Sequence, residues 1–99
     1  MDYNIFIKNP KLLIGLRFKA TNVNFYYKIT EIKEIDSHMC VCFIPINKET
    51  HKKENQSYDL LDTFLYNLYD KTDKTEIFKT DYLKILRQDK IKRLIKWMK

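Results

Sequence analysis

The residues best suited to chemistry in this chain are two cysteines and two histidines that lie close together in the sequence. His38, Cys40 and Cys42 are two positions apart and His51 follows, so the set contains the sulfur and imidazole ligands that zinc prefers. On a β-strand, residues two apart are separated by about 6.6 Å. A zinc ion with bonds of about 2.0–2.3 Å needs donors within about 4 Å of one another. We therefore expect no metal site and interpret the cysteines as buried thiols of a core strand.

Catalysis is not indicated by the other reactive residues. The cysteines lie in the most apolar segment, where a thiol is buried and inert. Carboxylate pairs such as Asp59 and Asp62, or Asp70 and Asp73, fall on or just after an expected helix, with no apolar pocket implied. Gly15 is the single glycine, which cannot build a glycine-rich phosphate loop. The sequence therefore predicts a protein that is not an enzyme and needs no cofactor.

Positive charge is concentrated at the C-terminal end. Of the 19 Lys and Arg and the 13 Asp and Glu residues, residues 80–99 hold seven and two, so this fifth of the chain has a net charge of +5 out of +6. Four interpretations remain open for such a helix: a solvated structural face, a nucleic-acid-binding helix, a helix that docks on an acidic protein, and a membrane-surface helix. The membrane interpretation is disfavoured because the apolar face is expected to cover the sheet. That face comprises Ile91, Leu94, Ile95 and Met98.

A second basic surface is expected on a hairpin. If Phe18 and Ile29 face the core, the alternate residues point outward and combine cations with an aromatic ring, which is typical of surfaces that stack bases and contact phosphates. The same residue types also suit a solvated strand. Together with the C-terminal helix, this surface gives the predicted partner-binding residues: Arg17, Lys19, Tyr26, Lys28, Lys84, Arg87, Lys92, Arg93, Lys96 and Trp97.

The N-terminal half has the pattern of a small antiparallel sheet. Alternating apolar residues predict strands, and Asn, Pro and Gly mark the turns between them. A slip in the alternation near Thr30 and Glu31 predicts a β-bulge. The expected elements are a strand over 3–7, a helical turn over 10–14, and strands over 16–20, 25–33 and 39–44, the last one central and ended by Pro45.

The C-terminal half changes to a helical period. After a charged loop over 47–56, Ser57 is expected to cap a helix, and a second helix begins at 80–81 with Tyr82, Leu83 and Leu86 inward. Arg87 and Lys90 would fall within the apolar stripe of that helix, so a bend or restart is expected at 88–89.

These elements predict one α+β domain over residues 1–99. Residues 1–46 would form a three- to four-stranded antiparallel meander, 47–56 a loop, and 57–99 two or three helices packed on one face of the sheet. With 44% apolar residues, a chain of this length has enough material for one core.

The N-terminus lacks the pattern of a signal peptide, and the longest apolar run, 39–46, is too short for a membrane helix, so we expect a cytoplasmic protein of a bacterium or of a host cell. The chain is rich in Lys and Ile and has one glycine. In this composition and in its expected elements it is similar to many phage-encoded accessory proteins, a class that includes anti-CRISPR-like inhibitors.

The expected function is binding of RNA, DNA or a protein–nucleic-acid complex. The alternative is inhibition of a host nucleoprotein machine by protein–protein contact, with aromatic anchors such as Tyr66, Tyr69 or Trp97.

Overall fold

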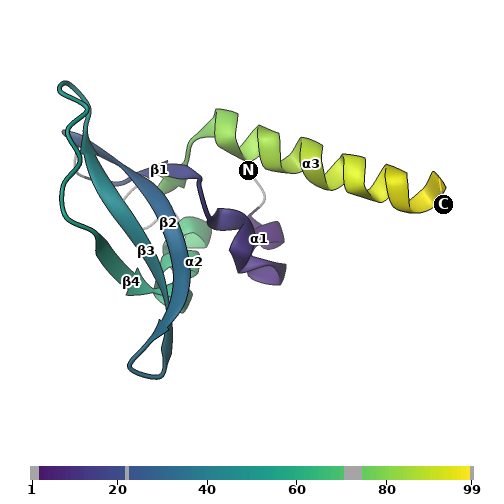
Figure 1. Cartoon of the computed structure of the whole chain (residues 1–99), viewed down its shortest axis with the longest axis horizontal. Coiled ribbons are helices and arrows are strands. Elements are labelled where there is room, and N and C mark those ends of the chain that lie inside the picture. Colours follow the sequence, from purple (N-terminus) through teal and green to yellow (C-terminus); the bar gives the residue numbers. More distant parts are fainter. Residues whose placement is uncertain (1–2, 22, 71–74, 99) are drawn as a thin grey trace.

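The chain forms a five-stranded antiparallel sheet with helices, which confirms the predicted α+β class (Figure 1). The computed structural model describes residues 3–21, 23–70 and 75–98, and for 93–98 it describes the backbone alone. The elements in chain order are α1 (Asn4–Lys8), a 3-10 helix η1 (Pro10–Leu13), β1 (Arg17–Lys19), β2 (Phe25–Ile35), β3 (His38–Asn47), β4 (Ser57–Leu60), α2 (Leu61–Asp70), β5 (Glu76–Ile77) and α3 (Lys79–Met98).

The strand order is β4-β3-β2-β1-β5, so the first four strands form a meander and β5 adds a further strand beside β1. The register of β2 against β3 shifts between Ile29 and Glu31, which confirms the predicted bulge. Because of this shift, Ile29 and Ile32 both lie on the core side, where Ile29 is fully buried and Ile32 packs against the core.

The strand expected over 3–7 is wrong, because α1 occupies residues 4–8. Tyr3 and Phe6 are three positions apart and both buried, a spacing that suits one helix face rather than one strand face. The helical turn expected after Pro10 is confirmed by η1, and Gly15 follows with a φ of +88°, a conformation that glycine adopts without strain.

The prediction that Pro45 ends its strand is also wrong, since β3 continues to Asn47. The carbonyl of Pro45 accepts the N–H of Glu54 at 2.9 Å, so the backbone N and O of residue 45 face the following loop rather than β2. The N–H that proline lacks is therefore not needed for the ladder between Pro45 and its partner Tyr27.

β3 is an interior strand with a neighbour on each edge, although β2 is the middle strand of the five, and Cys40, Val41 and Cys42 are all buried. Val41 faces the core, and the two thiols face the other way. They are flanked by Lys33 and Leu60, and by Glu31 and Tyr58, on the neighbouring strands. The longer side chains of these neighbours shield the two thiols from solvent.

The helix expected from Ser57 begins four residues later. Residues 57–60 instead pair with β3 as strand β4, because β3 would otherwise present an unpaired edge. Leu61, Phe64 and Leu68 of α2 then cover the core side of the sheet.

The helices α1, η1 and α2 lie on one side of the sheet, whereas α3 runs away from it (Figure 1). The expected bend at 88–89 is wrong, because α3 is a single helix from Lys79 to Met98. Tyr82 and Ile85 are buried, but Leu83 and Leu86, predicted to point inward, are 39% and 38% exposed.

The apolar face that was expected to cover the sheet is described at Ile91 alone, since the side chains of Leu94, Ile95 and Met98 lie outside the described residues. Ile91 is 55% exposed, and it follows Tyr82 by nine positions, which is two and a half helical turns. The apolar face predicted to start at Ile91 therefore begins on the side of the helix opposite to the side that packs.

Candidate functional site

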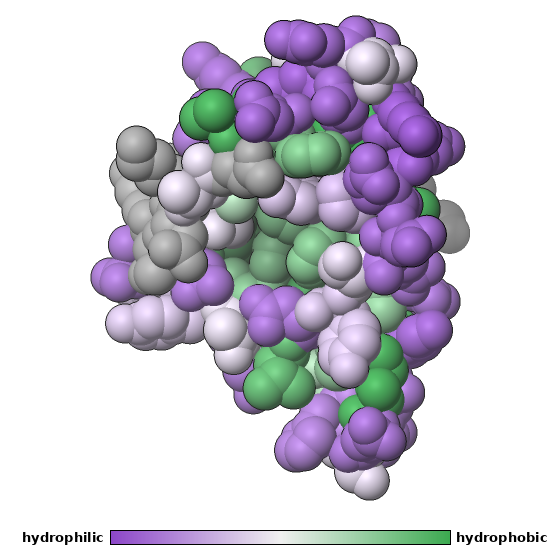
Figure 2. Space-filling view, turned by 90° about the vertical axis from the view of Figure 1, so that its left-hand side faces the viewer, coloured by the Kyte–Doolittle hydropathy of each residue, from purple (hydrophilic) through white to green (hydrophobic). Residues whose placement is uncertain are grey.

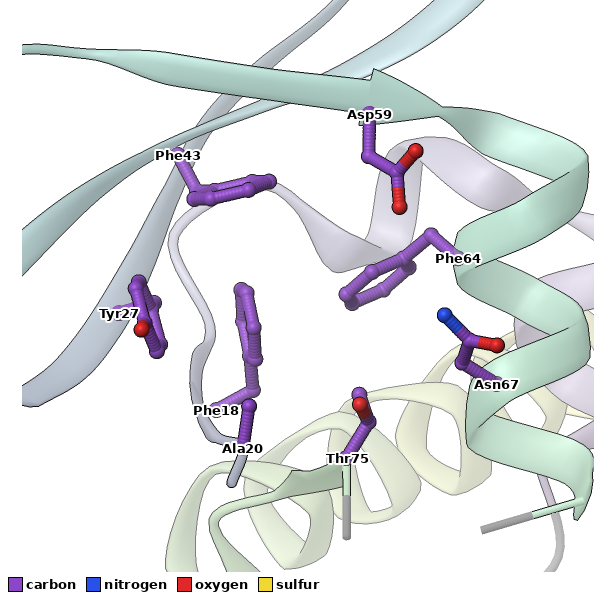
Figure 3. Close-up of a pocket in the computed structure, with 8 residues that line it drawn as sticks. All are labelled: Phe18, Ala20, Tyr27, Phe43, Asp59, Phe64, Asn67 and Thr75. Carbon is purple, nitrogen blue, oxygen red and sulfur yellow. The ribbon is translucent and has the colours of Figure 1, made fainter. Parts of the chain in front are cut away.

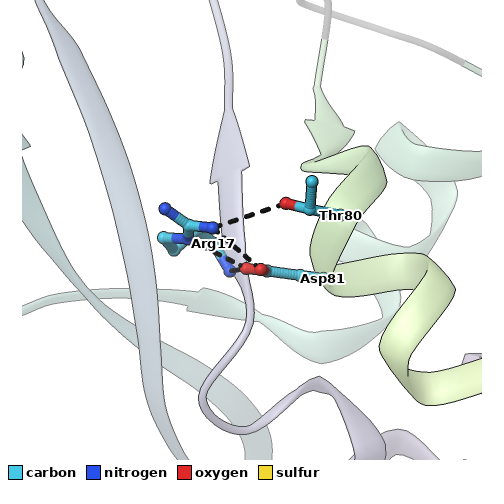
Figure 4. Close-up of polar contacts among 3 residues, drawn as sticks. All are labelled: Arg17, Thr80 and Asp81. Atoms are coloured by element: carbon cyan, nitrogen blue, oxygen red, sulfur yellow. Dashed lines mark hydrogen bonds and ion pairs between the residues drawn. The ribbon is translucent and has the colours of Figure 1, made fainter.

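The first turn of α3 is fastened to β1 by one arginine and one aspartate (Figure 4). Arg17 donates from Nε to Asp81 Oδ2 at 3.0 Å and from Nη2 to Asp81 Oδ1 at 2.9 Å. The backbone N–H of Arg17 also donates to Oδ2, at 2.8 Å. Thr80 Oγ1 lies 3.5 Å from Nη2, and the guanidinium lies 4.8 Å from the ring centre of Phe78. This bidentate contact fixes the position at which α3 leaves the sheet.

The contact changes the acid–base properties of both partners. The hydrogen bonds from Arg17 hold the pKa of Asp81 below its usual value, and nearby Lys84 adds to the effect, against the opposing effect of burial. The hydrogen bond to Asp81 raises the pKa of Arg17. Both groups therefore stay charged, and the pair persists at neutral pH.

The hairpin surface predicted from the sequence is present, but part of its charge is already paired. Arg17 lies opposite Lys28 in the β1–β2 register, and Phe18 and Ile29 are buried as the prediction required. Arg17 is held by Asp81, while Nζ of Lys19 lies 3.4 Å from Glu76.

Tyr26 packs on Phe78 at 5.7 Å between ring centres, and Lys28 is exposed. Of the three predicted hairpin cations, Lys28 is therefore the one that has no ion-pair partner among the described residues.

The predicted cations of α3 are displayed to solvent. Lys84, Arg87, Lys90 and Lys92 are all exposed. Within the described residues, Arg87, Lys90 and Lys92 take part in no ion pair. Residues three apart on a helix are neighbours, so three of these cations form one continuous row: Lys84, Arg87 and Lys90. The side chains of Arg93, Lys96 and Trp97, also predicted to bind the partner, lie outside the described residues.

A recess that the sequence did not indicate lies between the core side of the sheet and α2. Figure 2 shows one face of the molecule hollowed, with apolar side chains on the floor and hydrophilic ones around it. The recess has a volume of about 190 Å3. Its lining residues come from β1 to β4, α2 and the stretches next to β1 and β5, so no sequence spacing could have found them: Phe18, Ala20, Tyr27, Phe43, Asp59, Phe64, Asn67 and Thr75 (Figure 3).

In the part of the chain that the structure describes, no three His, Cys, Asp or Glu side chains are grouped so that they could hold a metal ion. Across the same residues, no helix combines the length and the apolar character needed to cross a membrane. Comparisons with protein-family models, with curated proteins and with solved structures gave no significant match.

Proposed function

We propose that this chain is a binding module for RNA, DNA or a protein–nucleic-acid complex, and that α3 is the arm that contacts the phosphates. The proposal rests on one observation: α3 is held at its first two turns, and the cations that follow are exposed along a helix that leaves the sheet. After Ile85, the last buried residue described in α3, the helix continues over 86–98, and at 1.5 Å per residue this gives an arm of about 20 Å.

The charges on this arm suit a phosphate backbone. Positive side chains that neutralise phosphates release condensed counterions, which supplies sequence-independent affinity. The row of Lys84, Arg87 and Lys90 with Lys92 offers about four such contacts, and acidic residues are few on this helix. Lys28, exposed on β2 opposite Arg17, would add one further cation for binding.

The salt dependence of binding tests the proposal. With about four phosphate contacts, raising the salt from about 50 to about 200 mM should weaken binding of a labelled oligonucleotide by about two decades, measured by fluorescence anisotropy. Arg87→Glu with Lys90→Glu should weaken binding and flatten the salt slope. Lys52→Glu with Lys53→Glu, at two exposed cations of the loop after β3, is the charge-matched control. Binding that does not depend on salt, or that falls equally in this control, would reject the arm as the binding surface.

A second candidate function is supported by α2. Tyr66 and Tyr69 are 61% and 70% exposed and three positions apart, so they form a small aromatic patch away from the core. Such residues anchor protein–protein interfaces, as an inhibitor of a host nucleoprotein machine would require. Alanine at Tyr66 and Tyr69 should then weaken capture of the partner from a nuclease-treated lysate more than Arg87→Glu does. The reverse order, or loss of the partner on nuclease treatment, favours the nucleic-acid function.

A further inference from the structure

The recess beside α2 combines aromatic walls with three polar groups that can each accept a hydrogen bond. Phe18 and Tyr27 stack at 5.0 Å between ring centres, and Phe43 and Phe64 meet Phe18 edge to face at 5.3 and 5.0 Å. These contacts lock the four rings, so the walls of the recess are formed before any ligand arrives.

Three polar side chains point into this space from different elements: Asp59 of β4, Asn67 of α2, and Thr75 just before β5 (Figure 3). Asp59 Oδ1 accepts the N–H of Leu60 at 2.8 Å. Among the described residues, the second oxygen of Asp59, the Asn67 amide and the Thr75 hydroxyl have no hydrogen-bond partner. None of these polar atoms is sealed away from solvent without a partner, so all three remain able to bind a group that enters the recess.

The chemistry of these groups selects the ligand. A carboxylate only accepts hydrogen bonds, and the amide and hydroxyl oxygens can accept them too, so a ligand that donates several N–H bonds can bind all three groups. Aromatic faces attract cations, and the carboxylate repels anions such as phosphate. A guanidinium is flat, carries five N–H donors, stacks on rings and is less strongly hydrated than an ammonium group.

The same molecule already contains a guanidinium held by this set of groups. Arg17 is bound by the carboxylate of Asp81, approached by the hydroxyl of Thr80 and placed over the ring of Phe78. In the recess, Asp59, Thr75 and the partly buried rings of Tyr27 and Phe43 supply the same three group types, but no arginine of the described chain lies among the lining residues.

We propose that the recess is a binding site for a guanidinium group, presented as an arginine side chain of a partner protein or carried by a small molecule. This site is separate from the basic arm and goes beyond the proposed function. It gives the protein a second, cation-accepting contact.

The test is a titration of the full chain with N-acetyl-arginine amide, followed in 1H–15N spectra, with N-acetyl-citrulline amide as the neutral probe of similar shape. The arginine probe should shift the backbone signals of the recess residues and bind at least tenfold more tightly than the citrulline probe, since hydrogen bonds to charged groups are the strong ones. Agmatine distinguishes the two sources: preference for agmatine indicates a small-molecule ligand, and preference for the blocked arginine indicates a partner's side chain.

Two variants complete the test. Asp59→Asn keeps an oxygen for the N–H of Leu60 but removes the charge, and it should weaken arginine binding about tenfold or more. Asp62→Asn makes the same charge change on the exposed face of α2 and should leave binding unchanged. If Asp59→Asn does not fold, Asn67→Ala is the alternative, because it removes a polar side chain of the recess and leaves the bond between Asp59 and the N–H of Leu60 intact.

Equal binding of arginine and citrulline, equal losses in the Asp59 and Asp62 variants, or shifts confined to other surfaces would overturn the proposal. Tighter binding of cytidine than of the arginine probe would overturn it as well, because the recess would then be a nucleobase site.

Discussion

The first two turns of α3 and the turns that follow differ in their surroundings, although they belong to one uninterrupted helix. In the first part, Asp81, Tyr82 and Ile85 are buried, Asp81 is bound to Arg17 of β1, and the ring of Tyr82 lies beside that of Phe6 in α1. In the second part, Leu86, Arg87, Lys90 and Ile91 are exposed. The first part determines the direction of the helix, and the second part can serve a partner without disturbing the core.

The second part remains helical although most of its described side chains are exposed, and there is a physical reason for this. Starting a helix is the unfavourable step, whereas each added residue gains one hydrogen bond. The buried first turns supply the start, and the following residues, rich in Lys, Arg, Leu and Ile and free of Gly and Pro, extend it. Cations near the C-terminal end are also favoured by the helix dipole.

If the first turns anchor α3, the largest loss of stability is expected from a substitution at Tyr82. This ring is 6% exposed and meets the ring of Tyr3 edge to face at 5.8 Å. Tyr82→Ala would leave a cavity in the contact between α3 and α1, and we expect a loss of about 3 kcal/mol in the free energy of unfolding, measured by urea denaturation. A loss under about 1 kcal/mol would mean that the first turns are not the anchor.

A smaller effect, with a pH dependence, is expected at Asp81. Its pKa is lower in the folded than in the unfolded chain, where it is about 3.9. The pair with Arg17 therefore stabilises the fold fully above that value and less as the pH falls through the lower folded pKa.

Asp81→Asn should lower the free energy of unfolding at pH 7 by about 1–2 kcal/mol, discounted because the side chain of Arg17 is 40% exposed, and should flatten its decline in acid. Glu76→Gln is the control, because that carboxylate pairs with Lys19 at the surface, where an ion pair contributes little. An equal effect of both variants would show that the pair is no stronger than a surface contact.

The parts of the fold that follow from local pattern were predictable, and the parts set by distant pairing were not. The alternation of β1 and β2 and its slip near Thr30 gave the hairpin and its bulge. Residues 57–60 have a helical period, yet they form a strand because the edge of β3 is available to pair with them. A single sequence does not carry that information.

The candidate sites show the same difference between features set by the local sequence and features set by distant contacts. Exposed cations on α3 were predictable because charge and helical period are both local properties. Arg17 was predicted to bind the partner, but its side chain is paired with Asp81, which is 64 positions away in the sequence. The recess depends on side chains that only the folded sheet and α2 bring together.

The smallest effect is expected in the second part of α3. Ile91 is 55% exposed and lies opposite the packed face, so Ile91→Ser should change the free energy of unfolding by less than about 0.5 kcal/mol, because little apolar surface is lost from the interior. Urea denaturation at several protein concentrations measures this. A loss above about 1 kcal/mol that grows with concentration would show that this face is covered by a second copy of the chain, and the distal helix would then be an interface rather than a free arm.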